Sequence, residues 1–104
     1  MQTFIMLTQL ISEEVTPSFC IQKKKQLVVE KVREYCPEIE WIQDYVIMGS
    51  WDYLDIFRAP DIQAALQVSM IVRSYGGAHT EIWPAVEWDN FEEVIRDLAE
   101  VMEV

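Results

Sequence analysis

The chain has 104 residues, 51% of them hydrophobic, and a formal net charge of −10, which suits a single domain with a real core. Its surplus of carboxylates repels phosphate backbones and acidic lipid surfaces, so we expect neither nucleic-acid binding nor membrane binding. The first residues lack the pattern of a signal peptide, and no apolar run approaches the ~20 residues of a membrane span, so the predicted location is cytoplasmic.

Residues 2–11 alternate between two faces, as a strand does. A helix is predicted from Thr16-Pro17, a typical N-cap and first turn, to about Tyr35. Two strands follow at residues 39–48 and 51–58. Only two residues, a glycine and a serine, separate these strands, so they are predicted to form a hairpin.

Pro60-Asp61 is typical of a helix start, and the second helix is expected over residues 62–75, closed by Gly76-Gly77. Residues 78–84 have the composition of a fourth strand. Residues 89–103 repeat apolar positions at helical spacing after an Asp-Asn-Phe-Glu segment that resembles a capping box. This segment predicts a C-terminal amphipathic helix.

The element order is therefore β-α-β-β-α-β with one appended helix, which is the ferredoxin-like arrangement of the α+β class. Two right-handed crossovers place both main helices on one face of a four-stranded antiparallel sheet. Residues 1–104 are read as one domain without a linker or repeat.

The two faces of the predicted sheet differ in composition. One face is rich in aromatic residues, namely Trp41, Tyr45, Tyr53, Phe57 and Trp83. The other is aliphatic, with Ile42, Val46, Leu54, Ile56 and Ile82. We expect the aliphatic face to lie beneath the helices, which leaves the aromatic face uncovered within one chain. Such a patch is typical of an interface or a ligand groove, so a homodimer or higher homo-oligomer is predicted, unless the C-terminal helix covers the face.

One stretch resembles the signature of the GYD domain family. It reads Gly49-Ser50-Trp51-Asp52-Tyr53-Leu54-Asp55-Ile56 and then Ala59-Pro60-Asp61, so that the Gly-Tyr-Asp core of the family appears as Gly49-x-Trp51-Asp52. His79-Thr80-Glu81 and the opening Phe4-Ile5-Met6-Leu7-Thr8 are similar too, whereas the first helix, with Lys23-Lys24-Lys25, departs from the pattern. The resemblance covers most of residues 2–100. It implies a dimeric α+β barrel similar to the ligand-binding domain of leucine-responsive regulators, without their DNA-binding helix-turn-helix.

Candidate catalytic residues are His79, Asp55 and Glu81. By alternation all three are expected on the aromatic face together with Tyr53, with Thr8 or Met6 of the first strand between them. Polar groups under a cover have to be hydrogen-bonded or functional. The functional interpretation is a proton-handling site, with His79 as acid or base and a carboxylate orienting it. The alternative is a hydrogen-bonded pair between chains or a solvated rim.

Candidate ligand-binding residues are Tyr53, Trp83, Trp51, Asp52 and Thr8. For Asp52 and the preceding Gly49, service in the hairpin turn is the leading interpretation. The alternative is effector binding, since the resemblance places this loop near the effector site of the related regulators.

No cofactor and no metal site is expected. One histidine with two carboxylates is a sparse ligand set, and the sequence lacks a phosphate-binding loop, a nucleophile elbow and a dinucleotide fingerprint. Cys20 and Cys36, if carried by one helix, lie roughly 24 Å apart and are expected to stay reduced.

Three hypotheses follow. The first is a homo-oligomeric domain that binds a small organic ligand between the sheet and its cover. The second is a cofactor-independent oxygenase or isomerase of the dimeric α+β barrel type. The third is a purely structural assembly domain. The sequence names neither a ligand nor a reaction.

Overall fold

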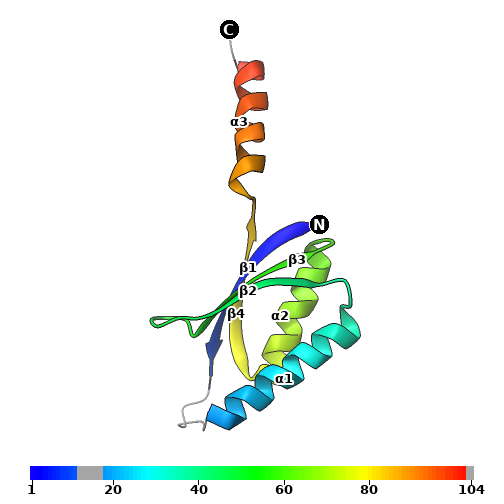
Figure 1. Cartoon of the computed structure of the whole chain (residues 1–104), viewed down its shortest axis with the longest axis vertical. Helices are drawn as coiled ribbons and strands as arrows, with labels where there is room; N and C mark the ends of the chain where they lie inside the picture. The colour runs from blue at the N-terminus through cyan, green and yellow to red at the C-terminus, as the bar shows by residue number, and fades with distance from the viewer. Residues whose placement is uncertain (12–17, 103–104) are drawn as a thin grey trace.

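The computed structural model describes residues 1–11 and 18–102 and shows the predicted element order (Figure 1). The expected helix start at Thr16-Pro17 and the side chain of Cys20 lie outside the described residues. The elements are β1 (Gln2–Leu10), α1 (Ser18–Tyr35), β2 (Glu40–Val46), β3 (Tyr53–Ala59), α2 (Ile62–Gly76), β4 (Ala78–Ala85) and α3 (Trp88–Met102).

The four strands form one antiparallel sheet in the order β2-β3-β1-β4. Helices α1 and α2 lie on the same side of this sheet, and α3 projects beyond its end (Figure 1). The predicted α+β, ferredoxin-like fold with a C-terminal helix is thereby confirmed. No helix in the described part of the chain is long and apolar enough to cross a membrane.

The ends of α2 form as the sequence predicts. The Asp61 side chain accepts a hydrogen bond from the amide of Ala64 at 2.9 Å, as an N-cap does. Gly77 ends the helix in the left-handed conformation, with φ of 59°. This helix packs directly on β4, β1 and β3 and so fixes which face of the sheet is covered.

The covered face is the aromatic one, contrary to the prediction. Phe4 and Phe57 are fully buried with stacked rings 5.8 Å apart, and Trp41 lies 5.5 Å from Phe57. Aromatic rings fill the space beneath α1 and α2 because their large area stabilises a small core most. The expected aliphatic layer under the helices is therefore wrong for Leu54 and Ile56, which lie on the opposite side.

A β-bulge explains part of this error. The β2–β3 register shifts between Trp41 and Gln43, so Ile42 is an extra residue without a partner in β3. After the bulge the alternation is reversed, and Tyr45 lies opposite Leu54 rather than on the side of Trp41. Two residues expected on one face therefore lie on different faces.

The side of the sheet away from the helices is called the open face here, and its apolar residues are Ile5, Leu7, Leu54, Ile56 and Trp83. Trp83 is 46% exposed. The prediction of an uncovered aromatic face is therefore wrong. The open face is mainly aliphatic, with Ile5, Leu54 and Ile56 half-buried and Leu7 buried at 4% exposure. Helix α3 does not cover it within one chain, since none of the described α3 residues is buried.

Candidate functional site

A cavity of about 570 Å³ lies between α1 and the helix-covered face of the sheet. It forms because α1 packs mainly on α2 rather than on the strands, as Figure 1 shows, where α1 crosses one end of α2. The two helices are in contact at Gly76, where a Cβ atom would lie at an ordinary contact distance of 3.5 Å from Val28 of α1. The remaining gap above the strands is the cavity.

The walls of the cavity are mostly apolar. They come from both helices and all four strands and include Met6, Leu10, Ile21, Val28, Val29, Trp41, Val72 and Ala78. Apolar walls that carry a few polar groups are typical of small-molecule sites, and the volume is within their usual range of about 300–1,000 Å³.

Three polar side chains reach the cavity from its sheet side. Thr8 is buried and lies opposite Tyr53 in the β1–β3 register, and Asp55 follows two residues along β3. Alternation therefore places all three on one face. Asp44 of β2 lies opposite Asp55 and also lines the cavity, where its carboxylate is 3.6 Å from the ammonium of Lys25 on α1.

This environment changes the acidity of two groups. Burial, together with the hydrogen bond and the negative charge of Asp44, raises the pKa of Asp55 from 3.8 to about 8, and Lys25 opposes the change. The Asp55 carboxyl is therefore largely protonated at neutral pH and can donate a hydrogen bond. Burial raises the pKa of Tyr53 as well, with contributions from Asp52 and Asp55.

The predicted cluster of His79, Glu81 and Asp55 does not form. In the β1–β4 register, His79 pairs with Gln9 and Glu81 with Leu7, so both lie on the open face. Asp55 pairs with Met6 on the covered face. The sheet separates the histidine from the aspartate, and the prediction placed them together because it misjudged the relative register of β3 and β4.

The other residues of β4 confirm this division. Trp83 is also on the open face, where its indole donates a hydrogen bond to Glu81 at 2.9 Å. Thr80 points to the helices, where it bonds Ser69 and accepts from Arg73 at 2.8 Å. Of the sequence candidates, the structure brings Thr8, Tyr53 and Asp55 together.

Asp52 joins the hairpin to β1. Its carboxylate accepts a hydrogen bond from the amide of Leu10 at 2.7 Å, and its own amide donates to the carbonyl of Thr8 at 2.8 Å. Gly49 has φ of 149°, which few other residues adopt. The backbone carbonyl of Asp52 accepts a hydrogen bond from the amide of Ile47 at 2.9 Å, which closes the hairpin, whereas its side chain bonds the neighbouring strand β1. Trp51 is half-buried beside this turn and is absent from the cavity lining among the residues described.

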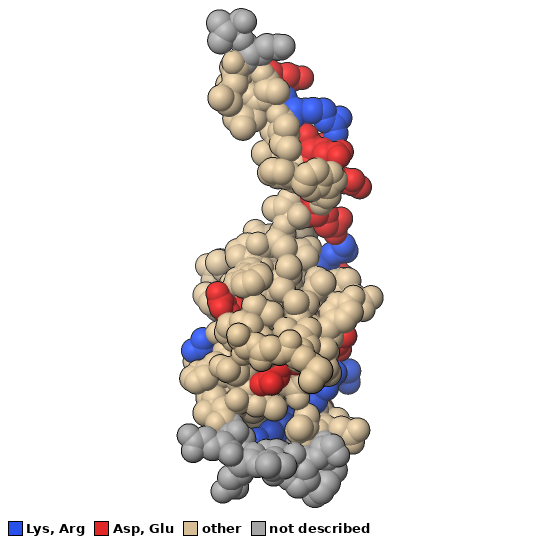
Figure 2. All heavy atoms as spheres, turned by 90° about the vertical axis from the view of Figure 1, so that its left-hand side faces the viewer, with Lys and Arg blue, Asp and Glu red and all other residues tan. Residues whose placement is uncertain are grey.

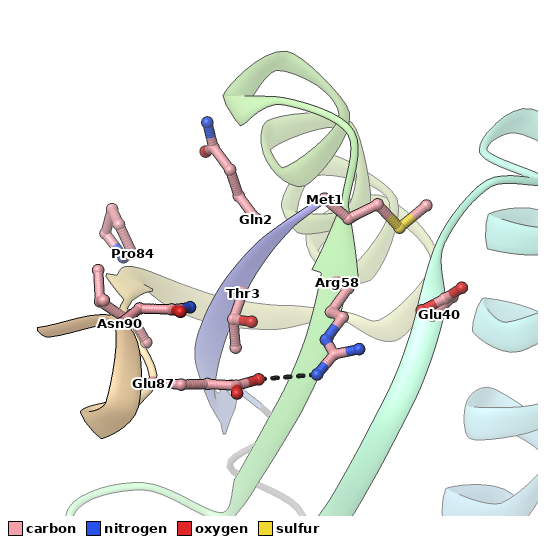
Figure 3. Close-up of a pocket in the computed structure, with 10 residues that line it drawn as sticks. Met1, Gln2, Thr3, Glu40, Arg58, Pro84, Glu87 and Asn90 are labelled. Atoms are coloured by element: carbon pink, nitrogen blue, oxygen red, sulfur yellow. Dashed lines mark hydrogen bonds and ion pairs between the residues drawn. The ribbon is translucent and has the colours of Figure 1, made fainter. Parts of the chain in front are cut away.

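A second hollow, of about 720 Å³, lies where α3 leaves the sheet (Figure 3). Arg58 of β3 reaches across it to Glu87, with 2.7 Å between guanidinium and carboxylate. Thr3 and Asn90 also line this hollow. Its two most prominent charged groups, Arg58 and Glu87, are paired with each other. We therefore regard the cavity under α1, with its mostly apolar walls, as the better candidate site.

Sequence reasoning missed Asp44, Lys25 and the valines of α1 as site residues. The signal was present, because Val28 and Val29 follow the lysine run in a helix whose apolar side has to face the sheet.

Within residues 1–11 and 18–102 no three His, Cys, Asp or Glu side chains form a group that could hold a metal ion. Cys36 is buried and unoxidised, and burial raises the pKa of its thiol.

Comparison with known proteins gives two matches. The model of the family described as the GYD domain matches residues 4–95. The crystal structure of the leucine response regulatory protein of Mycobacterium tuberculosis is similar, with a TM-score of 0.56 and 12% sequence identity. This likeness covers 83% of the chain and 51% of the regulator, so the chain spans about half of that protein, and it shows the fold alone. No curated protein matches the sequence.

Proposed function

Because the chain belongs to the GYD domain family, whose model matches most of it, we propose that it is a small-molecule-binding, self-associating domain. Its ligand site is the cavity between α1 and the sheet. The observation that carries this proposal is the convergence of Thr8, Tyr53 and Asp55 on one end of an otherwise apolar cavity. A core that served packing alone would be filled at this position, because interiors are close-packed.

The lining defines the chemistry of the ligand. Valines of α1, Trp41 and Met6 favour an apolar, flat or branched body. The protonated carboxyl of Asp55 favours a hydrogen-bond acceptor such as a carbonyl at the sheet end. We therefore propose an uncharged organic molecule with one polar end, smaller than the cavity of about 570 Å³.

Native mass spectrometry of the purified full chain tests this proposal. We expect a retained small molecule, or uptake of one from a library of apolar ketones and phenols. Because Trp41 lines the cavity, uptake should also quench part of the tryptophan fluorescence. A chain that retains and binds none of these, at millimolar library concentrations, would contradict the proposal.

Self-association is the second part of the proposal. On the open face Trp83 is exposed and the side chains of Ile5, Leu54 and Ile56 are half-buried. Burial of the remaining apolar area of this face would favour association. A purely structural assembly domain would also associate, but it would leave the cavity without a ligand. The cytoplasmic location stays a prediction from the sequence.

An enzyme is the alternative function, and one observation favours it. Asp55 has a pKa of about 8 inside the cavity, and a group whose pKa lies near the working pH is suited to proton transfer. A cofactor-independent oxygenase or isomerase would use Asp55 to move a proton of the substrate. The positive charge of Lys25, which lowers the pKa of Asp55, would stabilise the carboxylate form. His79 and Glu81 would not take part, because they lie on the other face.

Incubation of a bound ligand with the protein in heavy water separates binding from this alternative. Proton transfer by Asp55 would place deuterium on a carbon atom of the ligand, and Asp55→Asn would abolish this exchange while ligand uptake remains. Absence of exchange in the wild-type protein would leave the binding function and remove the enzymatic one.

A further inference from the structure

We propose that α3 is an exchanged arm, whose apolar stripe lies on the open face of a second copy of the chain while the second copy returns the same contact. This inference rests on the proposed self-association and names the element that produces it. It places helix on sheet, and not sheet on sheet, at the interface.

Helix α3 has a continuous apolar stripe that no residue in the described part of the chain covers. At 100° per residue its large apolar side chains fall within one side of the helix. They are 43–82% exposed and comprise Trp88, Phe91, Val94, Ile95, Leu98, Val101 and Met102. The opposite side is acidic, and Figure 2 shows Asp and Glu side chains along one edge of α3.

The arm is held away from its own sheet. Only Val86 and Glu87 connect β4 to α3, and the ion pair of Glu87 with Arg58 fixes this connection against β3 (Figure 3). Helix α3 then continues outward from the end of β4 (Figure 1). In this geometry, the stripe of α3 and the open face of the same chain cannot contact each other, although both are apolar.

The two surfaces match in length. The 15 residues of α3 span about 22 Å, and the 7 residues of β3 span about 23 Å. One helix can therefore lie along the row formed by Leu54 and Ile56 and reach Trp83 on the other side of β1.

The interface would also have sufficient area. Each contact would remove roughly 500 Å² of accessible surface from the arm and as much from the sheet. Two reciprocal contacts would then bury about 2,000 Å² in total, which is the size of a stable protein interface. A second copy is the natural occupant, because each chain carries both complementary surfaces and a two-fold axis uses each of them once.

Sedimentation equilibrium of the full chain at micromolar concentration tests the inference with two variants at adjacent positions. Leu98→Lys places a charge in the stripe, and we expect the dimer dissociation constant to rise on the order of 100-fold. Asp97→Lys changes the acidic side of the helix and is expected to leave the protein dimeric. Since neither residue is buried in the chain itself, both variants should keep the wild-type circular dichroism spectrum.

A photo-crosslink locates the contact. The crosslinker p-benzoylphenylalanine is placed at position 98, and unlabelled chains are mixed with nitrogen-15-labelled chains so that crosslinks between two copies carry both isotopes. We expect such mixed-isotope crosslinks to peptides from β1, β3 or β4. Crosslinks only to α3 of the other copy, or a Leu98→Lys variant as dimeric as the wild type, would overturn the exchanged arm and leave self-association intact. A monomeric wild-type chain would overturn both.

Discussion

The carboxyl of Asp55 faces that of Asp44 across the β2–β3 ladder, within the cavity that lies beneath α1. Lys25 forms an ion pair with Asp44, at 3.6 Å from its carboxylate, and acts on Asp55 with a smaller effect than burial and Asp44 do. The pair therefore divides its charge unequally, with a proton kept on Asp55 and a negative charge on Asp44 near the cavity rim. This division makes the cavity floor uncharged at neutral pH, and its effects are measurable.

The first prediction concerns stability and pH. The folded chain keeps its proton on Asp55 up to about pH 8, whereas the unfolded chain releases it near 3.8. Between these values the folded state binds more protons, so the free energy of unfolding falls as pH rises. We expect Asp55→Asn to remove this decrease and to be the more stable protein near pH 8. Urea unfolding at several pH values measures it, with the exposed Glu93→Gln as control. An unchanged slope for Asp55→Asn would refute the proton assignment.

The second prediction concerns the cavity volume. Val29→Phe adds an aromatic ring to the cavity wall, and Val29 is not a residue of the buried core. The substitution should weaken ligand binding at least tenfold because the ring occupies space that the ligand needs. Leu27→Phe makes a similar addition on α1 at a side chain that is 38% exposed, and is expected to leave binding unchanged. Titration followed by tryptophan fluorescence compares the two. Equal affinities would place the ligand elsewhere.

The third prediction concerns the hairpin. Asp52→Ala removes the acceptor for the Leu10 amide and is expected to lower the free energy of unfolding by about 1.5–3 kcal/mol, the usual contribution of a hydrogen bond to a charged group. Asp52→Asn keeps an acceptor and should lose less. Hydrogen exchange at the Leu10 amide locates the change. If Asp52→Ala abolished ligand binding at unchanged stability, Asp52 would be a binding residue instead.

The fourth prediction tests which side of β4 faces the helices. Thr80→Val leaves the Ser69 hydroxyl without its partner and removes one acceptor of Arg73, so a loss of about 1–3 kcal/mol in unfolding free energy is expected. Thr3→Val, on the open face, is the matched control and should stay within about 0.5 kcal/mol. Denaturant titration of both variants decides the matter. The reverse order of stabilities would invert the assignment of faces.

The element order was predictable because each helix of the ferredoxin-like unit has a local signal. Asp61 and Gly77 mark the two ends of α2, and both perform the expected capping. Such signals depend only on neighbours in the chain. The GYD resemblance likewise depends on a short stretch, and the family match over residues 4–95 confirms it.

The face that each strand presents to the helices was not predictable in the same way. Alternation gives two sets of residues, but the choice between them depends on which set packs against α2, which is a tertiary property. The bulge at Ile42 then reverses the alternation within β2. For the candidate site, Tyr53 and Asp55 could be paired from one strand, whereas adding His79 required the register between different strands.

The position of Asp52 affects how likeness within the family should be read. The segment that makes this chain recognisable contains a carboxylate that fastens a hairpin to a neighbouring strand, while the cavity wall is supplied in large part by α1, where the sequence departs from the family pattern. Two proteins can therefore share the recognisable segment and still accept different molecules. With the cavity proposed as the ligand site, transfer of a ligand from one member to another is justified by agreement at positions 28, 29 and 44, which lie outside the shared segment.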